Sequence, residues 1–322
     1  MPVYLRIQGA LYCAVALSVA LLAPFLGRLE EKSELLLVAL LITLLGVPHG
    51  ALDTLLAYES FRLKTLSRWL AFGVAYFVPA SLVVWLWATF PSVFLVGFLV
   101  ISLIHFSGDP QDAVEKSEIF TTPTGYGRCR SKRQVPLAAR VLYGGAVLIL
   151  PTLLHETEVA RLFSWLVGTA AAAPVIVWVH RLAWPWLLAG AVAGWKCWKL
   201  DCLGGLEILA TLALAVAAPP LIAFTVFFCA MHSARHILRM VGLSAQSSPR
   251  FLALASLAPT LLFMLLLGVG RWWLREFVLE AQVVQLLFVG LAAVTLPHMI
   301  LVEPLRLRGW QKSRAPGPSP RR

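Results

Sequence analysis

The chain has 322 residues, of which 59% are hydrophobic and only 13% are charged. Soluble globular chains are close to half apolar and a quarter charged, so this composition excludes an ordinary soluble protein. The formal net charge of +11 does not indicate nucleic acid as a partner, because the basic residues cluster between long apolar runs and at the C-terminus. In a membrane protein such clusters set the topology and meet anionic lipid.

The apolar runs predict an all-α, polytopic integral membrane bundle with about ten transmembrane helices. Each crossing needs about 20 predominantly apolar residues, or somewhat fewer where neighbouring helices cover the ends. Pro91 and Pro220 are expected to begin helices, since proline suits the first helical turn. The expected spans are 7–26, 35–57, 69–90, 91–106, 136–154, 170–195, 203–218, 220–240, 251–269 and 281–302.

The stretch 159–200 leaves the number of spans open, because it fits either one span after a short interfacial helix or two short spans. The basic residues favour ten spans. One side of the membrane then receives the basic loop 108–134 and the tail 305–322, together with most other loop lysines and arginines. That side is cytoplasmic by the positive-inside rule, so both termini are expected there. The prediction is a multi-pass protein of the cell inner membrane, with one domain over 1–304 and a basic, disordered tail.

Histidines recur near the ends of four expected spans, where a polar side chain is costly unless it has a partner. His49 and His105 belong to the second and fourth spans, and His298 belongs to the tenth. His232 and His236, four residues apart in the eighth span, share one face of a helix. All five lie about 18–26 Å from the start of their helix, at 1.5 Å per residue. Even-numbered spans run in the same direction, so these histidines are expected at one depth, toward the cytoplasm.

A cluster of imidazoles suits iron, zinc or copper. Ligating histidines usually donate their second ring N–H to a carboxylate or a carbonyl. Asp53 follows His49 by four residues, and Asp109 follows His105 by four, so both carboxylates are expected to orient ligands. The alternative is that the histidines form helix–helix hydrogen bonds or a proton relay in a transporter.

The remaining polar candidates receive weaker roles. His298 follows Pro297, and we expect it to support a ligand or to line the pocket rather than to bind a metal. Arg235 lies on another helical face than its neighbouring histidines, where a loop anchor or a contact with lipid phosphate is expected. A role in supporting the ligands or lining the pocket is the alternative for Arg235. His155 and His180 lie between spans and are expected at the membrane interface.

Four motifs resemble the Brp/Blh family of bacterial and archaeal β-carotene 15,15′-dioxygenases. They are PHGALD at 48–53, HFSGD at 105–109, FFCAMHSARH at 227–236 and PHMILVEP at 297–304. The resemblance implies an iron-dependent membrane enzyme that cleaves the central double bond of β-carotene with O₂ into two molecules of retinal, which typically serve a rhodopsin. It implies Fe²⁺ ligands at His49, His105, His232 and His236.

Two other classes of function remain open at this point. One is a membrane transporter that relays protons through its histidines and holds no metal. The other is a carotenoid- or retinal-binding protein that carries the polyene without cleaving it. Within the enzyme class, the sequence leaves open the exact carotenoid and the cleaved bond.

Overall fold

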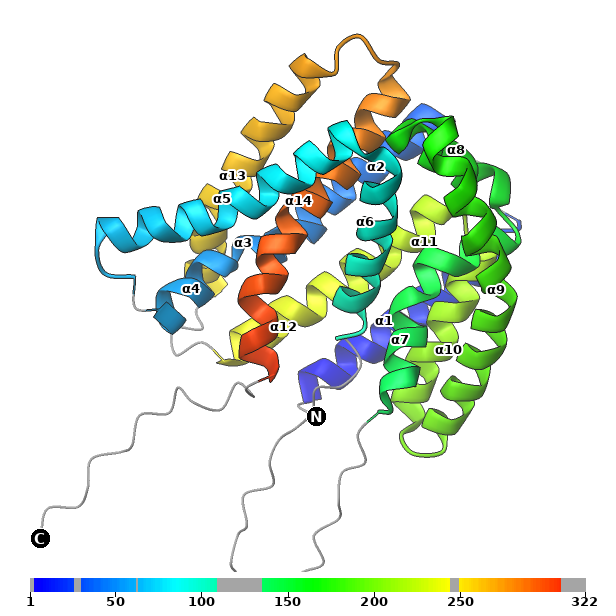
Figure 1. Ribbon diagram of the computed structural model, residues 1–322. Helices are drawn as coiled ribbons and strands as arrows, with labels where there is room; N and C mark the ends of the chain where they lie inside the picture. Colours follow the sequence, from blue (N-terminus) through cyan, green and yellow to red (C-terminus); the bar gives the residue numbers. More distant parts are fainter. Residues whose placement is uncertain (1–2, 26–29, 62, 109–134, 244–248, 308–322) are drawn as a thin grey trace, which may run out of the picture.

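The computed structural model describes residues 3–25, 30–61, 63–108, 135–243 and 249–307, and every regular element in these ranges is helical (Figure 1). The predicted all-α class is therefore confirmed. The helices of the first half are α1 (Val3–Leu22), α2 (Glu31–Leu41), η1 (Ile42–Gly46), α3 (Pro48–Ala51), α4 (Asp53–Phe61), α5 (Leu66–Thr89), α6 (Pro91–Phe106) and α7 (Leu137–Ile149). Those of the second half are η2 (Leu150–Leu153), α8 (Glu156–Val167), α9 (Thr169–Trp198), α10 (Cys202–Ala217), α11 (Pro220–Val226), η3 (Phe227–Ser233), α12 (Ala234–Leu243), α13 (Pro249–Trp273) and α14 (Leu279–Leu307).

Each of the ten apolar segments expected to span the membrane is helical over most of its described residues. In the described ranges, seven helices are long and apolar enough to cross a membrane, and the shorter apolar helices α6 and α10 match the expected fourth and seventh spans. The expected fifth span, 136–154, corresponds to the helical segment Leu137–Leu153, which forms a bent pair with Glu156–Val167. Pro91 and Pro220 stand at the start of their helices, as predicted. By helix length and composition, the chain is a polytopic membrane protein.

The ambiguous stretch 159–200 contains one long helix rather than two short spans. Helix α9 runs unbroken for 30 residues in spite of two internal prolines. The short helix α8 precedes it and is bent by 109° from Leu137–Leu153. His180 in α9 donates from Nδ1 to the carbonyl of Thr152 near this bend, at 3.0 Å.

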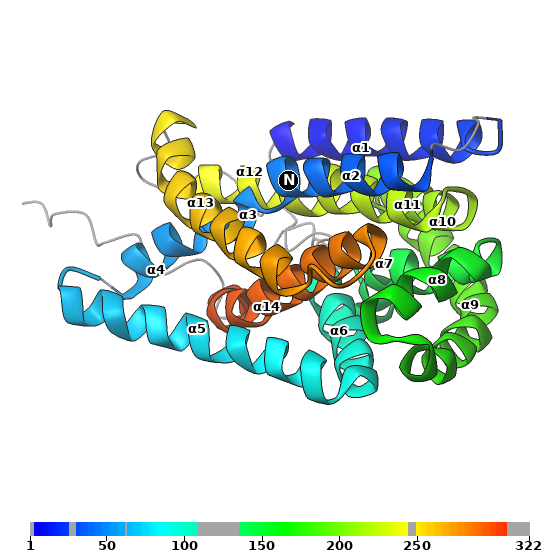
Figure 2. The ribbon, with the colours of Figure 1, turned by 90° about the horizontal axis from the view of Figure 1, so that it is seen from above.

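The helices form two groups with a shared interior. In one group, α10 packs against α1 and α9, and α9 also packs against α7 and α8. In the other, α14 packs against α5, α13 and α2. Helix α6 and the continuous segment α11–η3–α12 lie between the groups, as the two views show (Figures 1 and 2). Segments from both halves of the chain therefore meet in the middle of the bundle.

Two sequence predictions fall largely outside the described residues. Residues 109–134 of the predicted basic loop are not described, and Asp109 is among them. Helix α14 continues to Leu307, so the first residues of the predicted tail are helical. The disorder predicted for the rest of the tail concerns residues 308–322, which also lie outside the described ranges.

Candidate metal centre

Five histidines converge on one point between the two helix groups. They come from α3, α6, η3, α12 and α14, whose positions in the chain are far apart. The ring centroids are separated by 6.4 Å (His49–His105), 5.0 Å (His49–His232), 5.6 Å (His49–His236), 5.4 Å (His49–His298), 4.4 Å (His105–His232), 5.1 Å (His105–His298) and 5.3 Å (His236–His298). The convergence expected from helix depth and direction is present in the structure.

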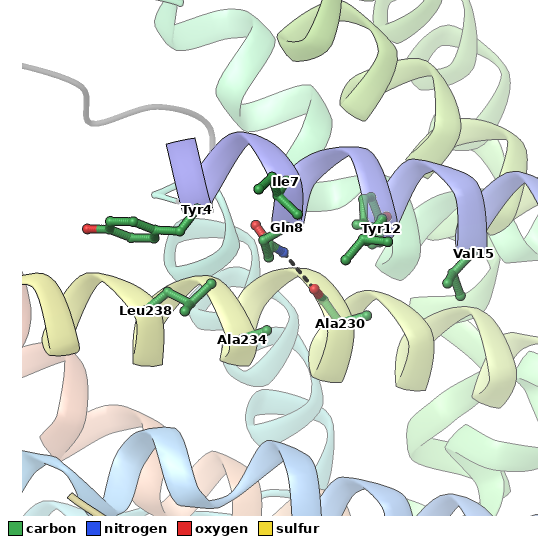
Figure 3. Close-up of a pocket in the computed structure, with 9 residues that line it drawn as sticks. Tyr4, Ile7, Gln8, Tyr12, Val15, Ala230, Ala234 and Leu238 are labelled. Atoms are coloured by element: carbon green, nitrogen blue, oxygen red, sulfur yellow. Dashed lines mark hydrogen bonds between the residues drawn. The ribbon is translucent and has the colours of Figure 1, made fainter. Parts of the chain in front are cut away.

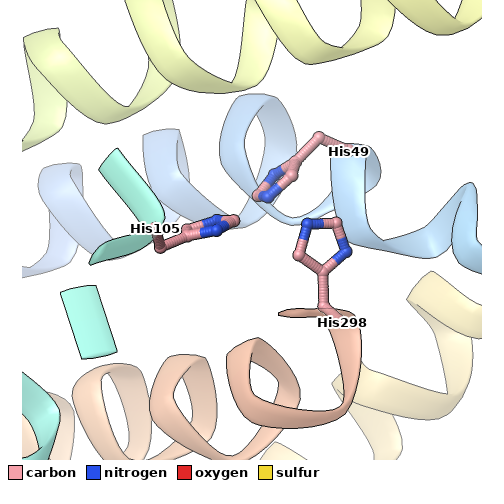
Figure 4. A group of neighbouring side chains, drawn as sticks. All are labelled: His49, His105 and His298. Carbon is pink, nitrogen blue, oxygen red and sulfur yellow. The ribbon is translucent and has the colours of Figure 1, made fainter. Parts of the chain in front are cut away.

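Three of these rings lie close enough together to hold one metal ion. His49, His105 and His298 each offer one ring nitrogen, and the three nitrogens lie within 4.8 Å of one another (Figure 4). His49 and His298 are buried, whereas His105 is half-buried. Figure 4 shows the three rings pointing toward a common space from three different helices. Imidazoles gathered in this way suit iron, zinc or copper.

His49 is oriented by an irregular stretch of its own helix. A π-helical turn, η1, replaces regular α-helix just before it, and its side chain Nδ1 donates to the carbonyl of Gly46. A π-helical turn leaves a carbonyl without its usual partner, and such turns occur frequently at functional sites. With Nδ1 donating, the His49 lone pair is on Nε2, the atom left to bind a metal.

His232 lies in a second π-helical segment, η3, which is fastened to the first. The hydroxyl of Ser233 donates to the carbonyls of Leu45 at 2.7 Å and Gly46 at 3.0 Å. Gly46 must lack a side chain because an added Cβ would stand 2.3 Å from Cε1 of Phe228. The ideal α-helical face expected for His232 and His236 is therefore interrupted, since η3 ends at Ser233. Both rings nevertheless approach His49.

His298 has a more direct place in the site than the sequence suggested. Its Nδ1 donates to both carboxylate oxygens of Asp53, at 2.8 and 2.9 Å. Tyr76 donates to the same carboxylate at 3.0 Å. The buried Nε2 of His298 has no hydrogen-bond partner among the described residues. A carboxylate on one ring nitrogen and a bare second nitrogen is the arrangement typical of a metal-binding histidine.

The hydrogen-bond partner of Asp53 in the structure thus differs from the expected one. Four-residue spacing pointed to His49, on the condition that one helix continued through both residues. The helix is interrupted at Leu52, because α3 ends at Ala51 and α4 begins at Asp53. The carboxylate therefore turns toward α14 instead.

Arg235 is buried inside the protein, which corrects the expectation of a loop anchor or lipid contact. Its side chain is 0% exposed. The guanidinium donates to the two carboxylate oxygens of Glu207 at 3.0 and 2.6 Å, and its Nε donates to Gln8 at 2.9 Å. Gln8 in turn donates to the carbonyl of Ala230 at 2.7 Å (Figure 3). This cluster, which we call the arginine network, lies on the side of η3–α12 that faces α1 and α10.

Sequence reasoning missed Glu207 and Tyr76. A single carboxylate inside the apolar run 203–218 was the available signal for Glu207, because an acidic residue inside a membrane span is rare and usually paired. Tyr76 offered no comparable signal, since tyrosines are common in membrane helices.

The donor set fits a resident metal ion. It is built of imidazole nitrogens. The surrounding groups bind the Nδ1 atoms of His49 and His298, and the buried Nε2 of His298 has no hydrogen-bond partner among the described residues. The only carboxylate hydrogen-bonded to a clustered histidine in the described residues, Asp53, binds the ring rather than the central space.

Residues 40–306 match the protein family described as β-carotene 15,15′-dioxygenase. A β-carotene 15,15′-dioxygenase from uncultured marine bacterium 66A03 is 27% identical over 279 residues, which cover 82% of this chain and 90% of that protein. A probable β-carotene 15,15′-dioxygenase, Blh, from Halobacterium salinarum is 27% identical over 322 residues, with 89% of each chain covered. No solved structure matches the chain.

Proposed function

The chain belongs to the β-carotene 15,15′-dioxygenase family, and from this premise we propose that it cleaves the central double bond of β-carotene with O₂. The products are two molecules of retinal, each of which receives one oxygen atom of O₂ as its aldehyde oxygen. The carbon–carbon double bond and the oxygen–oxygen bond both break, so no further oxidant or reductant is consumed. Retinal made in this way would be available to a rhodopsin.

We propose Fe²⁺ as the metal and His49, His105, His232 and His236 as its ligands. Imidazole ligands suit iron, and bound Fe²⁺ supplies the redox chemistry that lets O₂ react with an alkene. We add His298 to this set because Asp53 occupies its Nδ1 while its Nε2 is buried and bare. The chain's own residues hold the metal, orient the rings and keep the site dry. No side chain is required to act as a general acid or base.

The observation that carries this proposal is the convergence of five histidines from five helical segments on one buried point. Helix–helix hydrogen bonding, the chief alternative, would pair the inner nitrogens with backbone or side-chain groups of a neighbouring helix. Instead, Gly46 and Asp53 occupy outer nitrogens, and the Nε2 of His298 is left without a partner. A site of this kind inside a membrane protein also suits a substrate that dissolves in the bilayer of the cell inner membrane and enters between helices.

Expression in bacteria that make β-carotene tests the substrate directly. The cells should lose their carotenoid colour and accumulate retinal, identified by chromatography. Unchanged carotenoid in cells that demonstrably contain the folded protein would refute the proposed reaction.

Metal analysis and oxygen uptake separate the rival functions. The purified protein should contain close to one iron per chain, whereas a proton-relay transporter would contain none. Oxygen should be consumed together with β-carotene, whereas a carotenoid carrier would bind the polyene and consume no oxygen. His232→Ala should lose both iron and turnover, and a folded variant that keeps its iron would remove His232 from the ligand set.

A further inference from the structure

A narrow cavity of about 40 Å³ lies between α5, α6 and α14, apart from the histidine cluster. Its walls are apolar apart from two hydroxyl-bearing side chains, Ser102 and Thr295. Two small residues, Gly97 on α6 and Ala292 on α14, form part of its wall. An added Cβ at Gly97 would meet no atom within 4 Å, so the space beside this residue is open.

Two of the three helices that line the cavity, α6 and α14, also carry histidines of the cluster. On α6, Ser102 precedes His105 by three residues, and on α14, Thr295 precedes His298 by three. Residues three apart share one face of a helix. On α5, Val83 lines the cavity two turns beyond Tyr76, whose hydroxyl binds Asp53 at the metal site. Helices α6 and α14 therefore present one face to the histidines at one level and to the cavity at another, and α5 reaches Asp53 and the cavity in a similar way.

A continuous series of aromatic contacts joins the cavity to the histidines. Starting from the cavity wall, the ring centroids are separated by 6.1 Å (Phe94–Phe98), 6.0 Å (Phe98–Phe288), 5.4 Å (Phe288–Phe224), 5.5 Å (Phe224–Phe228) and 5.7 Å (Phe228–His232). Such spacing is typical of packed aromatic rings, whose faces form a rigid apolar surface. We call this series the aromatic wall.

We propose that the cavity and the aromatic wall receive one half of the polyene, including its terminal ring, and that Gly97 determines whether this half fits. The inference rests on the proposed function. When the central double bond lies at the histidines, each half of the molecule must extend away from them through apolar surroundings. Phe94 lies eleven residues before His105, about 16 Å along the helix, so the path offers an extended apolar route.

The occupant must displace a side chain to enter. A volume of about 40 Å³ holds little more than one water molecule, so the cavity is the closed form of the binding site. Phe98 is half-buried, stacks on Phe94 and meets Phe288 edge to face, which makes it the ring that turns aside. Because Gly97 is also half-buried, this side of α6 opens toward the surrounding lipid, where the carotenoid is dissolved.

The test is a series of larger side chains at Gly97 in the full-length protein. Gly97→Ala, Gly97→Leu and Gly97→Phe add bulk where no atom lies within 4 Å, and each favours helix over glycine, so the variants are expected to fold. Gly73 on α5 provides the matched control, because its Cβ would also meet nothing and it does not line the cavity. The same three substitutions are made there.

Two measurements are made on each variant. Binding of β-carotene to the metal-free protein is followed by quenching of tryptophan fluorescence, which requires no turnover. Cleavage is compared for β-carotene and for an apocarotenal that keeps one ring and carries a shortened second arm. Gly97→Phe should weaken β-carotene binding at least tenfold and lower kcat/KM for β-carotene by a similar factor. The apocarotenal, whose short arm can occupy the narrowed site, should keep most of its kcat/KM, and the Gly73 variants should match the wild type.

The outcomes distinguish this inference from the proposed function. If the wild type binds β-carotene but forms no retinal, the proposed function fails, and the binding data alone decide the role of the cavity. If the wild type forms retinal and folded Gly97→Phe and Gly97→Leu bind and cleave β-carotene normally, the assignment of the cavity is overturned. Equal losses for both substrates would also overturn it, since they would indicate damage to the metal centre rather than a narrowed binding site.

Discussion

The segment Pro220–Met240 carries buried polar side chains toward two opposite sides. The two sides differ in whether their polar atoms have hydrogen-bond partners within the protein. Toward α3 and α14, His232 and His236 join the histidine cluster. Toward α1 and α10, Arg235 joins the arginine network. Arg235 lies between the two histidines in the sequence, so one turn of one helix contributes to both.

The difference lies in how the polar atoms are satisfied. In the arginine network, the guanidinium binds both oxygens of Glu207, and Gln8 links Arg235 to the backbone of η3. The buried charges of Arg235 and Glu207 are therefore paired with each other and need no ligand. In the histidine cluster, the inner Nε2 of His298 has no partner among the described residues. Buried polar groups nearly always have hydrogen-bond partners. The histidine cluster, which leaves this nitrogen without a partner in the described part of the chain, is therefore the side that indicates the functional site. The arginine network, whose polar atoms are paired with one another, is the side that supports it.

The largest expected effect comes from a substitution that breaks the ion pair of the arginine network. Arg235→Met leaves the Glu207 carboxylate buried without its cation, and removal of one partner from a buried pair costs about 3–5 kcal/mol. The free energy of unfolding in detergent should fall by this amount. The double variant Arg235→Met/Glu207→Leu should recover most of the loss, because apolar replacement of a whole buried pair is often neutral.

His105→Ala is the matched substitution in the histidine cluster. In metal-free protein it should alter the free energy of unfolding by less than about 1 kcal/mol, since a half-buried ring is removed and no charge is left alone. Iron binding should be lost. If His105→Ala destabilised the metal-free protein as strongly as Arg235→Met, the proposed division between site and support would be wrong.

The second prediction concerns the contact between the two π-helical segments. Gly46→Ala places a Cβ 2.3 Å from Phe228, whose ring is held between His49 and Phe224 and cannot easily move. Overpacking of this kind costs about 1–3 kcal/mol. Thermal unfolding should show the loss, and Phe228→Leu in the same chain should relieve part of it. Gly50→Ala is the control, because its Cβ meets nothing within 4 Å and unfolding should be unchanged or slightly later.

The sequence predicted the helical class, the ten apolar segments and the convergence of the histidines. These properties follow from local composition, residue spacing and helix length. It did not predict the pairing of His298 with Asp53, which are 245 residues apart and meet only when α14 packs beside α4. Nor did it predict η1 and η3, because a π-helical turn depends on backbone hydrogen bonds. No residue pattern in these segments indicates them. The misplacement of Arg235 has the same origin, because its partners belong to other helices.

The third prediction concerns Asp53, which was expected to bind His49 and instead binds His298. Asp53→Asn removes the charge that polarises His298, and loss of such a partner typically weakens metal binding by about 10–100-fold. Competition with a chelator of known affinity measures the change. Tyr76→Phe should weaken binding less, because it leaves the bond between Asp53 and His298 in place. Equal metal affinity in Asp53→Asn and the wild type would remove His298 from the proposed ligand set.

The smallest expected effect comes from Ser233, the hydroxyl that fastens η3 to η1. Ser233→Ala removes the donor to Leu45 and Gly46, and a typical hydrogen bond contributes about 1 kcal/mol. Because Gly46 also accepts from His49, the loosened carbonyl should let that ring move, and iron should dissociate about fivefold faster. Thr225→Val is the matched control, since the Thr225 hydroxyl bonds only within its own helix among the described contacts. If both variants released iron at the same rate, Ser233 would stabilise the bundle without positioning His49, and the π-helical contact would belong with the arginine network as support rather than with the metal centre.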